Sequence, residues 1–223
     1  MARIILVHGA WHGGWCWDAV AVALRRAGHQ VTAPDLPGHA GATLADCAAV
    51  VAGAAGPALL VGHSLGGMVI EALAALAPGH ATGLVHLCSY LPLPGDSLAR
   101  LDRLTGAPPR AWPRDDQGRL LLPHDAARQM LYAGCPEAAV ATTLARLRPQ
   151  PVGPMRDPLT ARADLPRDYV LCRDDRAIPQ ALQRRMLDRA PVTQQHDRDW
   201  GHSPFLQAPD DLAALLDQIA RRG

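Results

Sequence analysis

Ser64 lies at the centre of a short glycine-containing motif that follows an apolar segment. Residues 62–66 read Gly-His-Ser-Leu-Gly and fit the pattern G-x-S-x-G. Residues 58–61 before the motif predict a buried strand, and the chain from Leu65 onward has helical spacing. A sharp strand-to-helix turn exposes a serine hydroxyl, and flanking glycines let neighbouring backbone approach it. The pattern predicts Ser64 as a nucleophile; the alternative is a tight turn without chemistry.

A serine hydroxyl is a poor nucleophile near neutral pH and needs a base that accepts its proton. In a strand–turn–helix arrangement of this kind the partners follow in the order Ser, Asp or Glu, His. His202 follows the last predicted strand, in the run Asp-Trp-Gly-His-Ser-Pro. We favour His202 over His196, which lies nearer the end of that strand and has no glycine before it.

An acid that orients the base is expected after the preceding strand. Residues 169–172 predict that strand, and Asp174 and Asp175 follow it. We favour Asp175, because it lies four residues before Pro179, where the next helix is predicted to begin. Asp174 remains the alternative acid.

Negative charge that develops on a carbonyl oxygen needs backbone N–H donors. One donor is expected from the residue after the nucleophile, which is Leu65, and the other from the loop after the first strand, where we choose Ala10. His8 and His12 lie in that loop and could suggest a metal site, but no glutamate accompanies them as in H-E-x-x-H. We expect His8, His12 and Asp35 to fix loops by hydrogen bonding, and we expect no metal.

The elements that must position these residues alternate between apolar strands and amphipathic helices. Short apolar runs rich in β-branched residues are typical of strands in a parallel sheet, covered by helices on both faces. Strands are predicted at residues 4–7, 30–33, 58–61, 84–88, 169–172 and 192–195. Helices are predicted at residues 18–27, 43–54, 65–77, 179–189 and 209–221.

Residues 90–158 interrupt this alternation. The segment holds most of the prolines, and only two helices are predicted in it, near residues 125–132 and 137–147. We interpret it as a cap insertion over the sheet, with residues 1–89 and 159–223 forming one α/β core.

Composition excludes several classes of function. Basic and acidic residues number 22 and 21, so no basic surplus favours nucleic-acid binding. The sequence contains no lysine, which excludes a Schiff base, a lysine general base and a P-loop lysine. The five cysteines form no C-x-x-C pair, so we expect neither a zinc cage nor a disulfide framework. No signal peptide or membrane span is evident, and a cytoplasmic protein without membrane partners is predicted.

Several motifs together resemble the α/β-hydrolase superfamily. The run from Leu6 to Trp15, the elbow from Val61 to Gly67, and Asp175 with Gly201-His202 are similar to the branch of plant methyl-ester esterases and hydroxynitrile lyases. The resemblance covers nearly the whole chain. It implies an α/β-hydrolase fold with a cap and a small-molecule ester or related carbonyl compound as substrate, without a cofactor.

Within that branch, the resemblance favours the esterases. The lyases carry a threonine in the first loop and a lysine directly after the catalytic histidine, whereas the matching positions here are Gly9 and Ser203. We therefore predict an ester hydrolase that forms an acyl-enzyme. The alternatives are a lyase, a cyclase or a thioesterase acting on a natural-product intermediate, or a small-molecule receptor without turnover.

Overall fold

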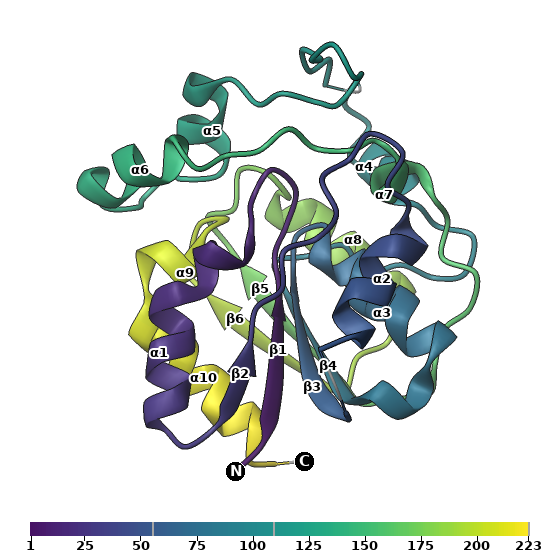
Figure 1. The fold of residues 1–223 in the computed structure, drawn as a ribbon, viewed down its shortest axis with the longest axis vertical. Helices are drawn as coiled ribbons and strands as arrows, with labels where there is room; N and C mark the ends of the chain where they lie inside the picture. Colours follow the sequence, from purple (N-terminus) through teal and green to yellow (C-terminus); the bar gives the residue numbers. More distant parts are fainter. Residues whose placement is uncertain (55, 109, 223) are drawn as a thin grey trace.

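The computed structural model describes residues 1–54, 56–108 and 110–222, and its strands form one six-stranded sheet (Figure 1). The strand order is β2-β1-β3-β4-β5-β6, and every neighbouring pair is parallel. The strands are β1 (Arg3–Val7), β2 (Gln30–Thr32), β3 (Ala58–His63), β4 (Ala81–Leu87), β5 (Arg167–Cys172) and β6 (Gln194–Arg198). The expected parallel sheet is confirmed.

Helices cover both faces of the sheet, because parallel neighbours need crossover connections (Figure 1). One face packs against α1 (Asp18–Arg26) and α10 (Pro209–Ala220), and the other packs against α2 (Leu44–Ala52), α3 (Gly66–Leu76) and α8 (Gln180–Arg189). Two separate apolar clusters fill the space on the two sides. Among the described helices, none combines the length and the apolar character needed to cross a bilayer.

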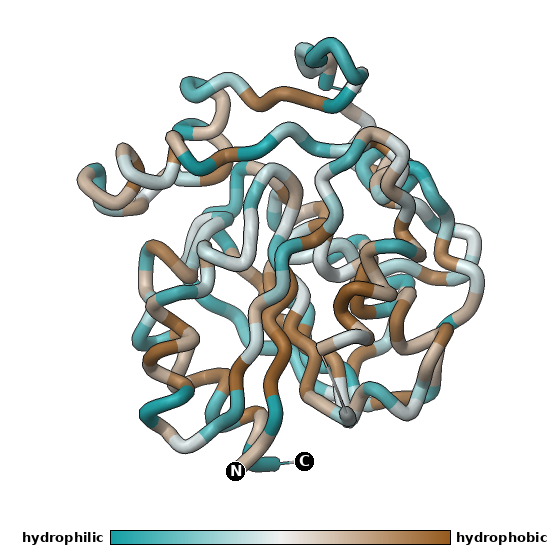
Figure 2. The backbone as a smooth tube through the Cα atoms, in the orientation of Figure 1, coloured by the Kyte–Doolittle hydropathy of each residue, from teal (hydrophilic) through white to brown (hydrophobic). Residues whose placement is uncertain are grey.

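The central strands are largely apolar (Figure 2). Every residue of β3 is buried, whereas β6 has a polar sequence and lies partly exposed at the edge of the sheet. Sequence analysis placed this last strand at residues 192–195, and the structure corrects it to Gln194–Arg198. Apolar patterning could not find its bounds, because its sequence Gln-Gln-His-Asp-Arg has no apolar residue.

Residues 90–158 contribute no strand to the sheet in their described part, and they pass over the carboxyl ends of the strands (Figure 1). They form α4 (Leu98–Asp102), α5 (His124–Met130), α6 (Glu137–Leu144) and α7 (Gly153–Arg156). The sequence predicted α5 and α6 but missed α4, α7 and, near the end of the chain, α9 (Pro204–Gln207), each of which spans one turn or little more. The division into a core and a cap remains a prediction.

A buried ion pair fastens α3 to the sheet. Glu71 of α3 is fully buried and accepts two hydrogen bonds from Arg167 of β5, at 2.7 and 2.9 Å. His86 of β4 lies 3.2 Å from the same carboxylate. Burial alone would raise the pKa of Glu71, but the hydrogen bonds from Arg167 and His86 outweigh it and lower the pKa to about 2. The pair therefore stays charged, and it fixes the helix that begins beside Ser64.

Glu71→Gln is expected to reduce the free energy of unfolding by about 3 kcal/mol at neutral pH, because it leaves the buried Arg167 without its carboxylate. A carboxyl group with a lowered folded-state pKa stabilises the protein fully above its unfolded pKa. The stabilisation is lost as the pH falls through the folded value of about 2. Urea unfolding should therefore show the difference from wild type shrinking below about pH 4.5. Glu137→Gln, at an exposed pair with Arg128, is the control and should change little.

Candidate active site

Ser64 occupies the turn between β3 and α3 in a conformation that side chains rarely adopt. Its φ is 53°, in the left-handed region, and its carbonyl accepts hydrogen bonds from Gly67 N at 3.1 Å and Tyr90 N at 3.2 Å. A Cβ at Gly62 would lie 2.5 Å from Gly66 O, and one at Gly66 would lie 2.5 Å from Val7 O. The glycines of the motif are therefore required by backbone packing, and they hold the serine at the carboxyl end of the central strand.

His202 and Asp175 form a buried pair. His202 Nδ1 lies 2.8 Å from Asp175 Oδ2, and both side chains are almost entirely shielded from solvent. The other carboxylate oxygen accepts hydrogen bonds from Ala177 N at 2.7 Å and Ile178 N at 2.8 Å. These bonds fix the carboxylate plane and thereby the imidazole. Asp174, the alternative acid, is exposed and is not brought to His202.

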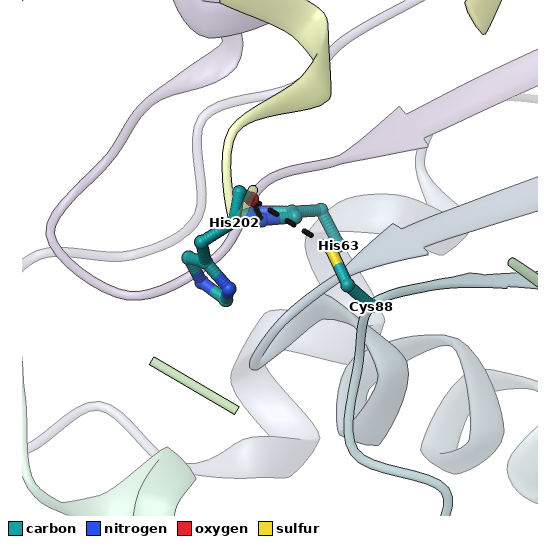
Figure 3. Close-up of side chains that lie close together, drawn as sticks. All are labelled: His63, Cys88 and His202. Carbon is teal, nitrogen blue, oxygen red and sulfur yellow. Dashed lines mark hydrogen bonds between the residues drawn. The ribbon is translucent and has the colours of Figure 1, made fainter. Parts of the chain in front are cut away.

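Two buried residues donate hydrogen bonds to the backbone carbonyl of His202. His63 Nε2 donates to His202 O at 2.7 Å, and Cys88 Sγ donates to the same oxygen at 3.5 Å (Figure 3). The rings of His63 and His202 lie 4.6 Å apart between centroids. Burial, followed by the proximity of His202 and His12, lowers the pKa of His63 well below its usual value, so His63 stays neutral.

The same three residues could be read as a metal site, because His63, Cys88 and His202 each offer one donor atom and these atoms lie within 4.8 Å of one another. The chemistry of the set does not fit a metal. Burial raises the pKa of the Cys88 thiol well above its usual range, which disfavours the thiolate that a metal requires. His202 Nδ1 is hydrogen-bonded to Asp175, and His63 Nε2 donates its hydrogen to the carbonyl of His202, so neither nitrogen has a lone pair to offer a metal. The cluster is better explained as a support for His202.

Two buried histidines fix the loop that contains Ala10. His8 Nδ1 donates to Gly9 O at 2.8 Å, and His12 Nδ1 donates to Ala10 O at 2.9 Å. Their other nitrogens accept hydrogen bonds, from Leu36 N and from the Tyr132 hydroxyl. Burial is the main cause that lowers the pKa of His8 to about 4 and that of His12 to about 3. The expected loop-fixing role is confirmed, and Asp35 also has it, since it accepts from Gly14 N at 2.7 Å.

Fixing the carbonyl of Gly9 also fixes the direction of the Ala10 N–H, because the peptide that joins them is planar. The segment 148–150 holds the other end of the loop, with Trp11 N donating to Gln150 Oε1 at 3.2 Å and Arg148 N donating to Trp11 O at 2.8 Å. Within the described ranges, neither Ala10 N nor Leu65 N donates a hydrogen bond to another residue. Both N–H groups are thus available to an incoming oxygen.

A cavity of about 470 Å³ lies above Ser64, a volume typical of sites for small molecules. Ser64, His202 and Ala10 line it on the sheet side, and residues of the segment 90–158 line the opposite side. Leu65 is buried beneath this surface at the start of α3, and His196 is not among the lining residues, since it pairs instead with Asp168 at 2.8 Å. The structure thus brings Ser64, His202 and Ala10 to one cavity, with Asp175 directly behind His202.

Sequence reasoning missed the residues that support this arrangement. His63 could have been noticed, because it lies inside the G-x-S-x-G motif. Tyr132, Arg148 and Gln150 carried no local signal, since they contact the first loop from positions more than a hundred residues away. Such long-range hydrogen bonds leave no periodic pattern in the sequence.

His12→Asn is expected to reduce the acid sensitivity of the fold, because Asn keeps a donor for Ala10 O but does not titrate. A histidine with a lowered folded-state pKa stabilises the protein above its unfolded pKa of about 6.5, and this stabilisation is lost as the pH falls toward the folded value of about 3. Between pH 7 and about 4.5 the variant should lose about 2 kcal/mol less unfolding free energy than wild type in urea titrations. An equal loss in both proteins, or the same benefit from the exposed control His39→Asn, would contradict the expectation.

Comparison with known proteins places the chain in one large family. Residues 4–215 match the model of the alpha/beta hydrolase family. A pyrethroid hydrolase from Sphingobium wenxiniae is 32% identical over 97% of this chain and 87% of its own, and methyl jasmonate esterase 1 from Vitis vinifera is 30% identical over 97% and 96%. The crystal structure of a pyrethroid hydrolase from Sphingobium faniae, 28% identical, superposes with a TM-score of 0.86 over 99% of this chain and 97% of that chain. The chain belongs to the alpha/beta hydrolase family and is a carboxylesterase-like member of it.

Proposed function

We propose that the protein hydrolyses small-molecule carboxylic esters, with Ser64 as nucleophile, His202 as general base and acid, and Asp175 as the residue that orients His202. The observation that carries the proposal is the buried His202–Asp175 pair at 2.8 Å, whose histidine lines the same cavity as Ser64. The names of the similar proteins, a pyrethroid hydrolase and a methyl jasmonate esterase, support ester hydrolysis.

The chemistry begins with the attack of Ser64 Oγ on the ester carbonyl carbon, while His202 Nε2 accepts the hydroxyl proton. Asp175 holds Nδ1 and stabilises the imidazolium that forms. The tetrahedral intermediate collapses when the bond to the alkoxy group breaks, and His202 returns its proton to the leaving alcohol. Water then attacks the acyl-enzyme, with His202 again accepting a proton, and the carboxylic acid departs.

The N–H groups of Ala10 and Leu65 would hold the oxyanion in both tetrahedral intermediates. Removing one donor of this kind typically lowers kcat about 10²–10³-fold. The hydrogen bonds from His8 to Gly9 O and from His12 to Ala10 O support this role, because they fix both peptides of the loop before any substrate binds. A donor that is already aligned needs no reorganisation during the reaction.

Two local features favour the esterase over a lyase of the type that this chain resembles. A Cβ at Gly9 would lie 2.8 Å from Ser64 Cβ, so the threonine found there in the lyases would not fit without a shift. Ser203, at the position of the lyase lysine, is fully buried, and no partner for its Oγ exists among the described residues. A lysine ammonium would be costly there because burial disfavours a charge without a partner.

Ser64→Ala and His202→Ala are each expected to lower kcat for 4-nitrophenyl esters about 10⁴-fold or more. Asp175→Asn should lower it about 10³–10⁴-fold, because His202 then loses the acceptor that sets its tautomer. Asp174→Asn is the matched control, since this neighbouring aspartate is exposed, and it should retain nearly full activity. Ester turnover that survives in Ser64→Ala would falsify the nucleophile assignment.

If the reaction passes through an acyl-enzyme, Ser64 should also react covalently with an ester analogue, which separates hydrolysis from the alternatives. A 4-nitrophenyl alkylphosphonate should add one phosphonyl group to the wild type, detected by intact-protein mass spectrometry, and no adduct should form on Ser64→Ala. Absence of the adduct in active wild type would favour a lyase or cyclase. Faster turnover of thioesters than of oxygen esters would favour a thioesterase. Ligand-induced thermal stabilisation with negligible turnover would favour a receptor.

A further inference from the structure

The cavity above Ser64 has four arginines in its lining. They come from two parts of the segment 90–158, namely residues 103–108 and 110–114, and the end of α7. The helix α4, which ends just before the first of them, packs against α7, so the two parts are neighbours in space (Figure 1). The four residues are Arg103, Arg110, Arg114 and Arg156.

These arginines differ from most others in the protein, because no carboxylate neutralises them within the described ranges. Many of the other arginines pair with acids, as in Arg167–Glu71 at 2.7 Å and Arg189–Asp96 at 2.8 Å. Arg110 donates to Ala177 O at 3.5 Å, and Arg114 donates to a backbone carbonyl, so both keep their full charge. A guanidinium remains protonated at any physiological pH.

The lining of the cavity contains far fewer carboxylates than arginines. Among the described lining residues the only carboxylate is Asp102, which accepts a hydrogen bond from the Tyr90 hydroxyl at 3.3 Å. The lining therefore includes four exposed cationic side chains and one carboxylate, although the whole chain is nearly balanced, with 22 basic and 21 acidic residues. The positive charge is thus a property of this cavity and not of the protein in general.

The rest of the lining is largely apolar. Trp11 follows Ala10, Ile178 lies just beyond Asp175, and both face the cavity together with Leu120, Met130 and Leu131. Trp11 packs edge-to-face against Trp112, with 5.8 Å between ring centroids. Low-dielectric walls of this kind strengthen the field of nearby charges and raise the local concentration of ligands of the opposite sign.

We propose that the preferred substrates are esters that carry a second, anionic group, in the form of monoesters of dicarboxylic acids with an apolar spacer. The inference rests on the ester hydrolysis proposed above. The ester carbonyl lies at Ser64 and Ala10, the spacer contacts the apolar walls, and the free carboxylate faces the arginines. Carboxylates match the planar donor groups of arginine, which can bind them with two parallel hydrogen bonds.

The test compares two substrates that differ in charge but share a leaving group and chain length. These are 4-nitrophenyl hydrogen suberate, which has a free carboxylate, and its neutral methyl ester, and nitrophenolate release is followed for both. Wild type should show a kcat/KM about tenfold or more higher for the anionic ester at low ionic strength. This preference should lie mainly in KM, and it should shrink at about 0.5 M salt, where the charges are screened.

The variant that tests the assignment carries Arg103→Gln, Arg110→Gln, Arg114→Gln and Arg156→Gln together, and the single changes show how the effect is shared. The ratio of the two kcat/KM values should fall to near one in the combined variant. Arg26→Gln, an exposed arginine of α1 that does not line the cavity, is the control and should keep the wild-type ratio. Equal rates for both esters in wild type, or a preference that survives in the combined variant, would overturn the proposal.

Failure of the proposed function is distinguishable from failure of this inference. If neither ester is hydrolysed, ester hydrolysis is refuted, and isothermal titration of wild type and the combined variant with the anionic ester then decides the inference. Tighter binding to wild type than to the combined variant supports the anion site, and equal binding overturns it.

Discussion

The close approach of backbone around Ser64 is the constraint on which the rest of the site depends. At Gly62, Gly66 and Gly67 an added Cβ would lie 2.5, 2.5 and 2.3 Å from the nearest backbone oxygen. The β3–α3 turn therefore lies in direct backbone contact with β1 and with the chain after β4. In this turn Ser64 has a φ of 53°. A strained residue of this kind persists only when its surroundings hold it in place. The sheet, and the buried Glu71–Arg167 pair that fastens α3, supply that rigidity.

Neutral histidines complete the support. His8, His12 and His63 are buried, each donates one ring N–H to a backbone carbonyl, and burial lowers the pKa of all three. A neutral imidazole can donate at one nitrogen and accept at the other, so it can fix two groups at once. Two of these histidines orient the loop of Ala10, and the third holds the backbone of His202. The arrangement depends on burial, because protonation would remove the acceptor nitrogen and place a charge among apolar residues.

The sequence was sufficient to predict the core of the fold. The four inner strands, β1, β3, β4 and β5, are almost entirely buried, and their apolar runs predicted them, because a central parallel strand is shielded on both faces. The bounds of β6 were wrong because its sequence Gln-Gln-His-Asp-Arg carries no such pattern. The choice of Asp175 over Asp174 relied on spacing, and the structure adds the physical reason for a difference between them. Only Asp175 is buried, with two backbone N–H groups bonded to its carboxylate.

The segment 90–158 was the least predictable part, and the reason lies in how it is held. Its helices are short, and it packs on the core through scattered apolar side chains and through long-range hydrogen bonds, such as those from Trp11 N to Gln150 and from the Tyr132 hydroxyl to His12. These contacts link the segment to the loop of Ala10, so it is not an independent cover over a finished site. Gln150 and Arg148 hold the loop of Ala10, while Arg103 and Arg156 of the same segment line the cavity. Changes near residues 148–150 should therefore affect the hydrolysis of any ester. Changes at the arginines should affect the preference for an anionic ester over a neutral one.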